Sequence, residues 1–460
     1  MSLTDIFQKI DSNHDRYVRE LKELLAIPSV STYSHQRGDV RRAAEWVLNH
    51  CKRIGLEARL HDTGGHPVVL ASRCPHPGRP TLLIYGHYDV QPAEPEEEWN
   101  TAPFKPTVRD GFLYARGASD DKGQFFTYLK ALEVILAVKG DLPINVKILV
   151  EGEEEIGSPH LGAFLEKNRE ELRADAIAIS DGSQFSEDIP AITYGLRGLS
   201  YVQLNVQGPR TDLHSGSFGG IAPNPVNGLV SILAQLKNPD GTVAVPGFYD
   251  TVAPLEPWER EAMKALPFDE ERLKAYLGLE SLCEEPGYSA LESKTARPTL
   301  DINGISGGFS GEGAKTVIPA KAGAKVSMRL VPNQKPQEIA ALFTRYVMEL
   351  CPREVRLQVE ALHGAEPVLV SRDLPQMQAA VRAIRAGFGV APVFIREGGS
   401  IPIVNLFKEI LGLEAILLLG WGRPDDGAHA PNERFSLEDF KKGIRSAAAL
   451  FFELHACCCP

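Results

Sequence analysis

Four short apolar runs, each followed at once by histidine, acidic or glycine residues, constrain the fold of this chain more than any other feature. The runs cover residues 81–85, 144–150, 176–179 and 415–419. Runs of this length are typical of strands that are buried on both faces in a helix-covered parallel sheet. Residues 122–138 and 160–172, which lie between runs, have the apolar spacing of helices. The pattern therefore predicts an α/β domain whose mostly parallel sheet is covered by helices.

The middle of the chain has a different pattern. Apolar and polar residues alternate over residues 201–206, 324–330 and 355–360. This period of two predicts antiparallel strands with one face in solvent. Residues 336–350, between the last two of these strands, have helical spacing. We therefore expect a discontinuous α/β domain over residues 1–197 and 371–460, with an inserted α+β domain over residues 198–370.

Composition excludes several classes of protein. The chain of 460 residues has 49 Lys and Arg against 60 Asp and Glu, and this net charge of −11 disfavours nucleic acid as a partner. No run approaches the ~18 consecutive apolar residues of a membrane span, and the N-terminus lacks the pattern of a signal peptide. Seven cysteines are too few for a disulfide framework in a chain of this length. We expect a cytoplasmic protein with reduced thiols. We also expect the terminal residues 457–459, all cysteine, to be a frayed tail rather than a soft-metal site with His455.

Histidine and acidic residues follow the predicted strands at their carboxyl ends, where ligands collect in parallel sheets. His87 and Asp89 are two residues apart after a strand, so they lie on one side of the chain. Asp89 is placed to support His87 directly or through the local backbone. Glu154 and Glu155 are adjacent and point in different directions. One of them can therefore bind a metal while the other takes a proton.

Three more residues, Asp120, Asp181 and His429, complete a candidate metal site with His87 and Glu155. Asp120 lies at the start of a predicted helix, where the helix dipole stabilises a carboxylate. Two divalent cations would be balanced by three carboxylates and one hydroxide, with both imidazoles neutral. Mixed imidazole and carboxylate ligands suit Zn²⁺, with Mn²⁺ or Co²⁺ as alternatives. Each residue alone is typical of an ordinary turn, but their recurrence at four strand ends favours a two-metal site.

Four motifs resemble the signatures of the two-zinc metallopeptidases of the carnosinase, aminoacylase and carboxypeptidase G family. The motifs are Gly86-His87-Tyr88-Asp89-Val90, Ala118-Ser119-Asp120-Asp121-Lys122-Gly123, Glu154-Glu155-Ile156-Gly157-Ser158 and His429-Ala430-Pro431-Asn432-Glu433. Together they are highly specific, and the resemblance covers nearly the whole chain. It implies that the discontinuous domain is catalytic and that the inserted domain is a lid that also forms a homodimer.

The resemblance assigns a role to each residue of the candidate site. It implies that Asp120 bridges the two metals, that His87 and Asp181 bind opposite metals, and that Glu155 and His429 are the remaining ligands. It also implies that Glu154 is the general base and that Asp89 orients the ligand His87 without binding a metal itself. A cis peptide bond between Asp120 and Asp121 is a further feature that the resemblance implies.

Three segments of the sequence look most like the carnosinase-like dipeptidase branch of the family. They contain His214, Arg329 and Ser400. The resemblance implies that His214 reaches the substrate carbonyl in the neighbouring subunit's site and that Arg329 grips a carboxylate. Ser400 and the backbone N–H groups of its Gly-rich turn would hold the substrate C-terminus.

The expected activity is metal-dependent hydrolysis of the peptide bond in dipeptides or similar small peptides, with two metals activating a bridging water. The alternative within hydrolase chemistry is an N-acyl-amino-acid deacylase that uses the same two-metal site. A non-catalytic protein that keeps the fold is the second alternative. It is disfavoured because every ligand and the base are present in the sequence.

Overall fold

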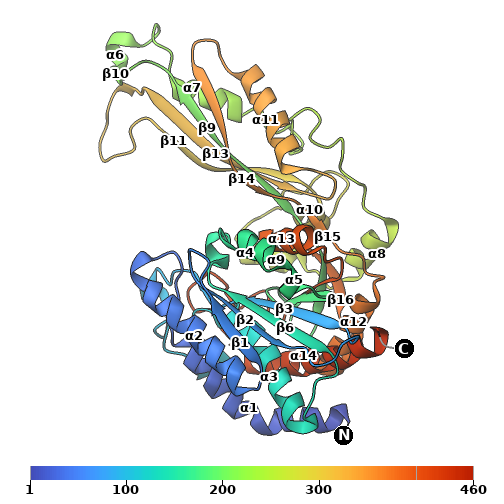
Figure 1. The fold of residues 1–460 in the computed structure, drawn as a ribbon. Coiled ribbons are helices and arrows are strands. Elements are labelled where there is room, and N and C mark those ends of the chain that lie inside the picture. Colours follow the sequence, from blue (N-terminus) through green and yellow to red (C-terminus); the bar gives the residue numbers. More distant parts are fainter. Residues whose placement is uncertain (1, 400, 459–460) are drawn as a thin grey trace. The chain divides into compact units, whose positions relative to one another are not determined.

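The main sheet contains all four predicted strands, and Figure 1 shows several strands of this sheet side by side. The computed structural model describes residues 2–399 and 401–458, and within them this sheet has nine strands. Their order is β1-β2-β6-β3-β7-β17-β8-β15, and β16 pairs with β8. The strands are β1 (Glu57–His61), β2 (Val68–Arg73), β3 (Thr81–His87), β6 (Asn145–Glu151), β7 (Ala176–Ile179), β8 (Ala191–Leu196), β15 (Val368–Leu369), β16 (Val393–Glu397) and β17 (Ile416–Leu419).

The four predicted strands are the parallel centre of this sheet. β6, β3, β7 and β17 are consecutive parallel neighbours, and β1, β2 and β8 add antiparallel pairs on either side. The prediction of a mostly parallel α/β sheet is therefore confirmed. The central strands are mostly apolar because helices cover both of their faces.

Successive residues of β3 show how the two faces are covered. Tyr85 packs against Phe407 of α13 (Pro402–Leu411), with ring centroids 5.2 Å apart. Gly86 faces the opposite side, where an added Cβ would lie 2.4 Å from the Cβ of Phe125 in α3 (Lys122–Lys139). α3 packs in turn with α1 (Leu3–Leu25) and α14 (Leu437–Cys458), and its Phe126 contacts aromatic rings of α2 (Arg37–Arg53) (Figure 1).

A second sheet, of four antiparallel strands, contains the three alternating segments predicted for the middle of the chain and one strand that was not predicted, β11. Its order is β11-β13-β9-β14. The buried side chains of the strands pack against α7 and α11 in one core that includes Val202, Leu204, Leu229, Val326 and Phe343. The elements are β9 (Gly198–Gln207), β11 (Thr299–Gly307), β13 (Lys321–Leu330), β14 (Arg356–Ala365), α7 (Pro225–Leu233) and α11 (Pro336–Leu350).

The described chain divides into two compact units. The first comprises Met1–Tyr194, Val370–Ile395 and Ile403–Pro460, and the second comprises Gly195–Leu369 and Arg396–Pro402. The last of these segments differs from our expectation, which placed residues 371–460 together in the first domain. Hydrogen bonds and ion pairs explain the difference. Arg396 pairs with Glu259, and Nε of Arg197 donates to the carbonyl oxygen of Gly398 at 2.9 Å.

Shorter elements complete the fold. They are β4 (Thr107–Arg109), β5 (Phe112–Tyr114), β10 (Leu213–His214), β12 (Val317–Ile318), β18 (Arg434–Ser436), α4 (Leu161–Lys167), α5 (Arg169–Leu172), α6 (Ser215–Phe218), α8 (Pro257–Ala265), α9 (Glu270–Leu277) and α10 (Ala290–Ala296). A longer helix, α12 (Pro375–Phe388), packs against α14. The single helix predicted over residues 160–172 is wrong, because the helix is interrupted at Asn168, whose side chain donates to the carbonyl of Phe164. The predicted frayed tail is also wrong as far as Cys458, because α14 continues to that residue. No described helix is both long enough and apolar enough to span a membrane.

Candidate metal centre

His87 and Asp181 meet because their strands are neighbours. His87 is the last residue of β3, and Asp181 follows β7 by two residues. The parallel register of the two strands pairs Tyr85 with Ile179, so the next residues reach the same edge of the sheet. Nε2 of His87 lies 3.8 Å from Oδ2 of Asp181.

Asp120 lies between two groups of candidate ligands. Its Oδ1 is 3.2 Å from Nε2 of His87, and its Oδ2 is 2.9 Å from Nε2 of His429. His429 in turn lies 3.3 Å from Oε2 of Glu155. Ligand atoms of His87, Asp120 and Asp181 all lie within 4.8 Å of one another, and so do those of Asp120, Glu155 and His429. The structure thus gathers all five predicted ligands, with Asp120 common to both groups.

This grouping differs from one implication of the family resemblance. His87 and Asp181 were expected on opposite metals, but they belong to the same group of three. The physical reason is the sheet order, because β3 and β7 are adjacent and parallel. Glu155 follows β6 on the other side of β3, and it shares a group with His429 instead. The implied cis peptide bond between Asp120 and Asp121 is present.

Asp89 supports both the histidine and the acidic segment. Nδ1 of His87 lies 3.1 Å from the main-chain oxygen of Asp89 and 3.4 Å from its Oδ1. The two carboxylate oxygens of Asp89 also accept hydrogen bonds from the backbone N–H groups of Glu154 and Glu155, at 3.3 and 3.2 Å. Asp89 is itself fully buried. Its carboxylate therefore links the end of β3 to the segment after β6.

Two side chains outside the predicted set also hold the ligands. Oδ2 of Asp121 accepts a hydrogen bond from the backbone N–H of His87 at 3.2 Å. Gln91 donates its side-chain N–H to Oε2 of Glu155 at 2.8 Å. Sequence reasoning missed the role of Gln91. Its only signal is its position two residues after Asp89.

Gln124 connects three loops of the site, and sequence reasoning also missed it. Its Oε1 accepts from the backbone N–H groups of Trp421 and Gly422, at 2.6 and 3.3 Å. Its Nε2 donates to the carbonyl oxygens of Ser119 and Gly182, at 2.9 and 3.1 Å. These partners lie next to Asp120, next to Asp181 and in the segment that leads to His429. Nothing in the sequence distinguishes Gln124 from another polar residue of a helix.

Electrostatic coupling within the cluster is strong. Burial would raise the pKa of Asp120, but a hydrogen bond from His429 and the proximity of His87 lower it below the ordinary value. Hydrogen bonds to Asp120 and Glu155 raise the pKa of His429 to about 10. Burial and the charge of Asp120 raise the pKa of Asp181 to about 6. In the metal-free protein His429 therefore keeps a proton between the carboxylates of Asp120 and Glu155. A bound cation would replace the positive charge of that proton.

Glu154 is held near the cluster without belonging to either group. Burial raises its pKa well above the ordinary value, His87 opposes the shift, and Asp181 and Glu155 add to it. Because Glu154 and Glu155 are adjacent in a short 3-10 turn (Glu154–Ile156), their carboxylates have separate environments. The arrangement leaves Glu154 able to hold a proton beside the cluster.

The donor set fits divalent cations. It combines two imidazoles with three carboxylates, which is the ligand chemistry of Zn²⁺ and of Mn²⁺ or Co²⁺. Nε2 of His87 is buried and makes no hydrogen bond to any described residue, although carboxylate oxygens surround it. A buried nitrogen without a partner is costly unless something else binds it. A cation at this place would satisfy the nitrogen and offset the carboxylate charges.

A third acidic group has the spacing of a metal site but a different electrostatic setting. Glu20, His50 and Glu133 lie close together among α1, α2 and α3. Lys130 pairs with both carboxylates, at 2.6 Å to Oε2 of Glu133, and Arg16 pairs with the same two side chains. These two cations already neutralise the two carboxylates. We therefore read this group as an ion-pair network.

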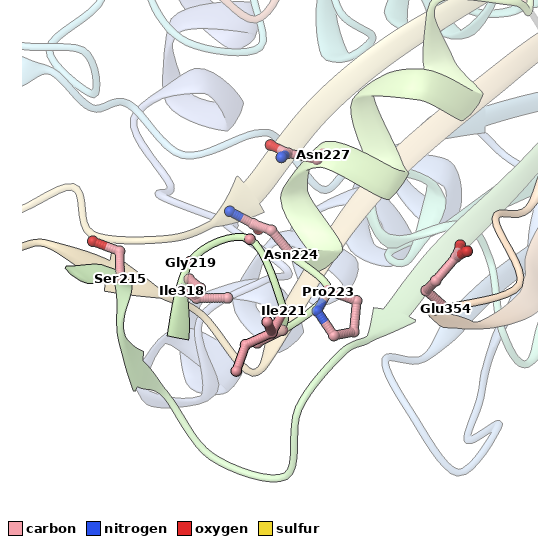
Figure 2. A pocket seen from close by; sticks show the side chains of 10 residues that line it. Ser215, Gly219, Ile221, Pro223, Asn224, Asn227, Ile318 and Glu354 are labelled. Carbon is pink, nitrogen blue, oxygen red and sulfur yellow. The ribbon is translucent and has the colours of Figure 1, made fainter. Parts of the chain in front are cut away.

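The residues expected to contact substrate belong to neither group of candidate ligands. His214 ends β10 in the second unit, and its exposed ring accepts a hydrogen bond from the backbone N–H of Gly216 through Nδ1, at 3.0 Å. Arg329 lies half-buried near the end of β13. Burial of Arg197 lowers the pKa of Arg197 to about 10, and the positive charge of Arg329 contributes to this shift. Ser400 lies outside the described residues. Directly after His214, a pocket of about 530 Å³ is lined by Ser215, by several residues between Gly219 and Asn227, and by Ile318 and Glu354 (Figure 2).

Comparison with known proteins gives one consistent result. The family described as peptidase family M20/M25/M40 matches residues 83–453. The Cys-Gly metallodipeptidase dug1 of Schizosaccharomyces pombe is 36% identical over 470 residues, which cover 99% of this chain and 98% of the relative. The human Beta-Ala-His dipeptidase is also 36% identical, with coverage of 98% and 92%. The crystal structure of human carnosine dipeptidase 1 has a TM-score of 0.86, at 35% identity and 99% coverage of both chains.

Proposed function

Because this chain belongs to peptidase family M20/M25/M40, we propose that it is a metal-dependent dipeptidase that hydrolyses the peptide bond of dipeptides or similar small peptides. The observation that carries this proposal is the position of Asp120 between two groups of imidazole and carboxylate ligands. Relatives of nearly equal length that are named dipeptidases support the substrate class. The alternative of an N-acyl-amino-acid deacylase is not favoured by these relatives.

We assign one cation to each group of ligands. His87 and Asp181 would hold the first cation, Glu155 and His429 the second, and Asp120 both. Zn²⁺ is the proposed metal, with Mn²⁺ or Co²⁺ as alternatives, because all three accept mixed nitrogen and oxygen ligands. When bound, such cations polarise the scissile carbonyl and lower the pKa of water to near neutrality.

Proton transfer is the task that we assign to Glu154. Its carboxylate accepts a proton from the attacking water and later delivers that proton to the leaving amine. The position of Glu154 supports this role, because its carboxylate lies beside the ligand Glu155 but belongs to neither group of ligands. Asp89 fixes the backbone of Glu154 and Glu155 and thereby the direction of both carboxylates.

Recognition of the substrate is assigned to the second unit and the segment near residue 400. His214 would stabilise the negative charge that develops on the carbonyl oxygen, while Arg329 and Ser400 would bind the substrate carboxylate. We also propose that the protein is a cytoplasmic homodimer, joined through the inserted domain, in which His214 serves the neighbouring subunit's site. Sedimentation of the purified protein tests the dimer.

A substrate panel with metal-loaded protein tests the proposed activity. The panel contains α-linked dipeptides, a β-alanyl dipeptide, a tripeptide and N-acetyl amino acids. We expect dipeptides to be cleaved and the activity to disappear when a chelator removes the metal. Cleavage of the N-acetyl amino acids alone would instead identify the protein as a deacylase. Activity that persists in chelator would remove the two-metal site from the mechanism.

A further inference from the structure

Glu433 is a fully buried carboxylate that none of the roles above uses. It lies four residues after His429, just before β18, and its side chain has no exposed surface. A charged group in such a place needs partners for its oxygen atoms. The structure supplies them from one short loop, the segment from Arg116 to Asp120 that carries the shared ligand.

The contacts account for both oxygens of Glu433. Oε1 accepts from the backbone N–H groups of Ser119 and Asp120, at 2.8 and 3.0 Å. Oε2 accepts from the backbone N–H of Gly117 at 2.9 Å and from Nη1 of Arg116 at 2.8 Å. Converging backbone N–H groups of this kind form a cavity that favours an anion. Three of the four donors are backbone groups, so the carboxylate determines the path of the chain itself.

The geometry points to Glu433 as a positioning residue that sets the place of Asp120 in the metal centre, and we propose that it is required for tight metal binding. This inference rests on the proposed role of Asp120 as the ligand shared by both cations. Because the backbone N–H of Asp120 is itself a donor to Glu433, movement of Glu433 shifts the carboxylate of Asp120 directly. Glu433 also belongs to the segment of His429, so one side chain couples the loops of two ligands.

A neutral side chain of the same shape cannot make these four contacts. Glutamine has one acceptor oxygen, and its NH₂ group would face either the N–H groups of Ser119 and Asp120 or those of Gly117 and Arg116. Two buried donors would then lose their acceptor and meet another donor. We therefore expect the Arg116–Asp120 loop to shift in Glu433→Gln. Changes of this kind behind metal ligands typically weaken metal binding by about 10- to 100-fold.

The test measures metal binding without any substrate. Metal-free wild type and Glu433→Gln are titrated with Co²⁺, and binding is followed by calorimetry and by the visible absorption of the bound ion. The matched control is Asp439→Asn. Asp439 is also a fully buried carboxylate of the first unit, and its Oδ2 accepts from Nε of Arg423 at 2.6 Å, but it contacts no candidate ligand. Thermal unfolding of the metal-free proteins shows how much each substitution costs in stability.

We expect wild type to bind two Co²⁺ ions and Glu433→Gln to bind at least one of them about 10- to 100-fold more weakly, with a changed absorption spectrum. Asp439→Asn should lose stability but keep wild-type affinity and spectrum. Wild-type affinity and spectrum in Glu433→Gln would overturn the inference.

If Glu433→Gln does not fold, Glu433→Asp replaces it. Its shorter side chain cannot span both pairs of donors, and wild-type binding by that variant would equally overturn the inference. Failure of wild type to bind two ions would instead contradict the proposed function.

Discussion

Oδ2 of Asp120 lies 2.9 Å from Nε2 of His429, although the two residues come from distant parts of the chain. Asp120 lies two residues before the start of α3, whereas His429 lies in the loop between β17 and β18 with a φ of 62°. A left-handed backbone is uncommon for a non-glycine residue and persists where surrounding contacts enforce it. Asp120 belongs to both groups of ligands, so changes in either loop should affect the binding of both proposed cations.

Glu154→Gln should separate metal binding from proton transfer. The amide cannot accept a proton, so we expect turnover of a dipeptide to fall by about 10²- to 10⁴-fold. Bound metal should stay at the wild-type ratio, since Glu154 belongs to neither ligand group. Steady-state kinetics and elemental analysis measure the two quantities. Glu97→Gln, at an exposed position, is the control, and near-normal turnover in Glu154→Gln would remove Glu154 as the base.

His214→Ala should lower turnover and leave metal binding intact. Nδ1 of His214 accepts a hydrogen bond from Gly216, which leaves Nε2 to carry the proton that a developing oxyanion would bind. Loss of one such donor typically costs about 10²- to 10³-fold in kcat. Elemental analysis of the same samples measures metal content. His363→Ala, another exposed histidine of the second unit, is the control, and loss of metal in His214→Ala would contradict its assignment to the substrate.

Gln124→Glu should destabilise the first unit. The carboxylate keeps the acceptor for Trp421 and Gly422 but loses both donors, and it places an oxygen against the carbonyls of Ser119 and Gly182. Leaving buried groups unpaired costs about 1–3 kcal/mol each. Chemical denaturation of the metal-free protein measures the loss. Gln378→Glu is the control, because exposed Gln378 donates to only one carbonyl of the same unit, and an equal loss in both variants would contradict the prediction.

The central strands could be predicted because strands that are buried on both faces consist mostly of apolar residues. Ala176–Ile179 and Ile416–Leu419 are buried at every position, and such runs are incompatible with an exposed face. The antiparallel strands β1 and β2 at the edge and the interruption at Asn168 were not predicted. They depend on pairing partners and on one side-chain hydrogen bond, which hydropathy does not record.

The ligand types of the candidate site could be predicted, but their grouping could not. Histidine and carboxylates at the ends of buried strands indicate a metal site from residue chemistry alone. Which ligands share a cation depends on the order of the strands, and the adjacency of β3 and β7 is what places His87 with Asp181. The role of Gln124 depends on four backbone groups from separate loops, and these come together only in the folded chain.

Metal binding should become tighter as pH rises. The pKa of His429 is raised to about 10 in the metal-free protein by Asp120 and Glu155, so the ring is protonated at neutral pH. A cation must displace that proton, and its affinity should increase with pH up to about 10. In the metal-free protein the same ion pairs stabilise the fold fully below pH 6.5, and this contribution is lost as pH rises towards 10. Calorimetry in buffers of different ionisation enthalpy counts the released protons, and no proton release at pH 7 would contradict the prediction.

His50, which lies outside the candidate metal centre, should make the protein sensitive to mild acid. Its ring is 2% exposed, stacks on Trp46 and lies against Phe126, and burial with the nearby charges of Lys130 and Arg53 lowers its pKa to about 2. The ring therefore stays neutral in the folded protein, whereas the unfolded chain takes up a proton below about pH 6.5. Because the unfolded state then binds more protons, stability is lost as pH falls.

This one group should lower the free energy of unfolding by about 2 kcal/mol between pH 6.5 and pH 5. His50→Phe keeps an aromatic ring between Trp46 and Phe126 but removes the titrating group. We expect the variant to lose stability less steeply over this pH range than wild type, whatever its stability at pH 7. Denaturation with urea at pH 6.5 and pH 5, in chelator to exclude metal release, measures both slopes. Parallel slopes in the two proteins would show that His50 does not titrate on unfolding.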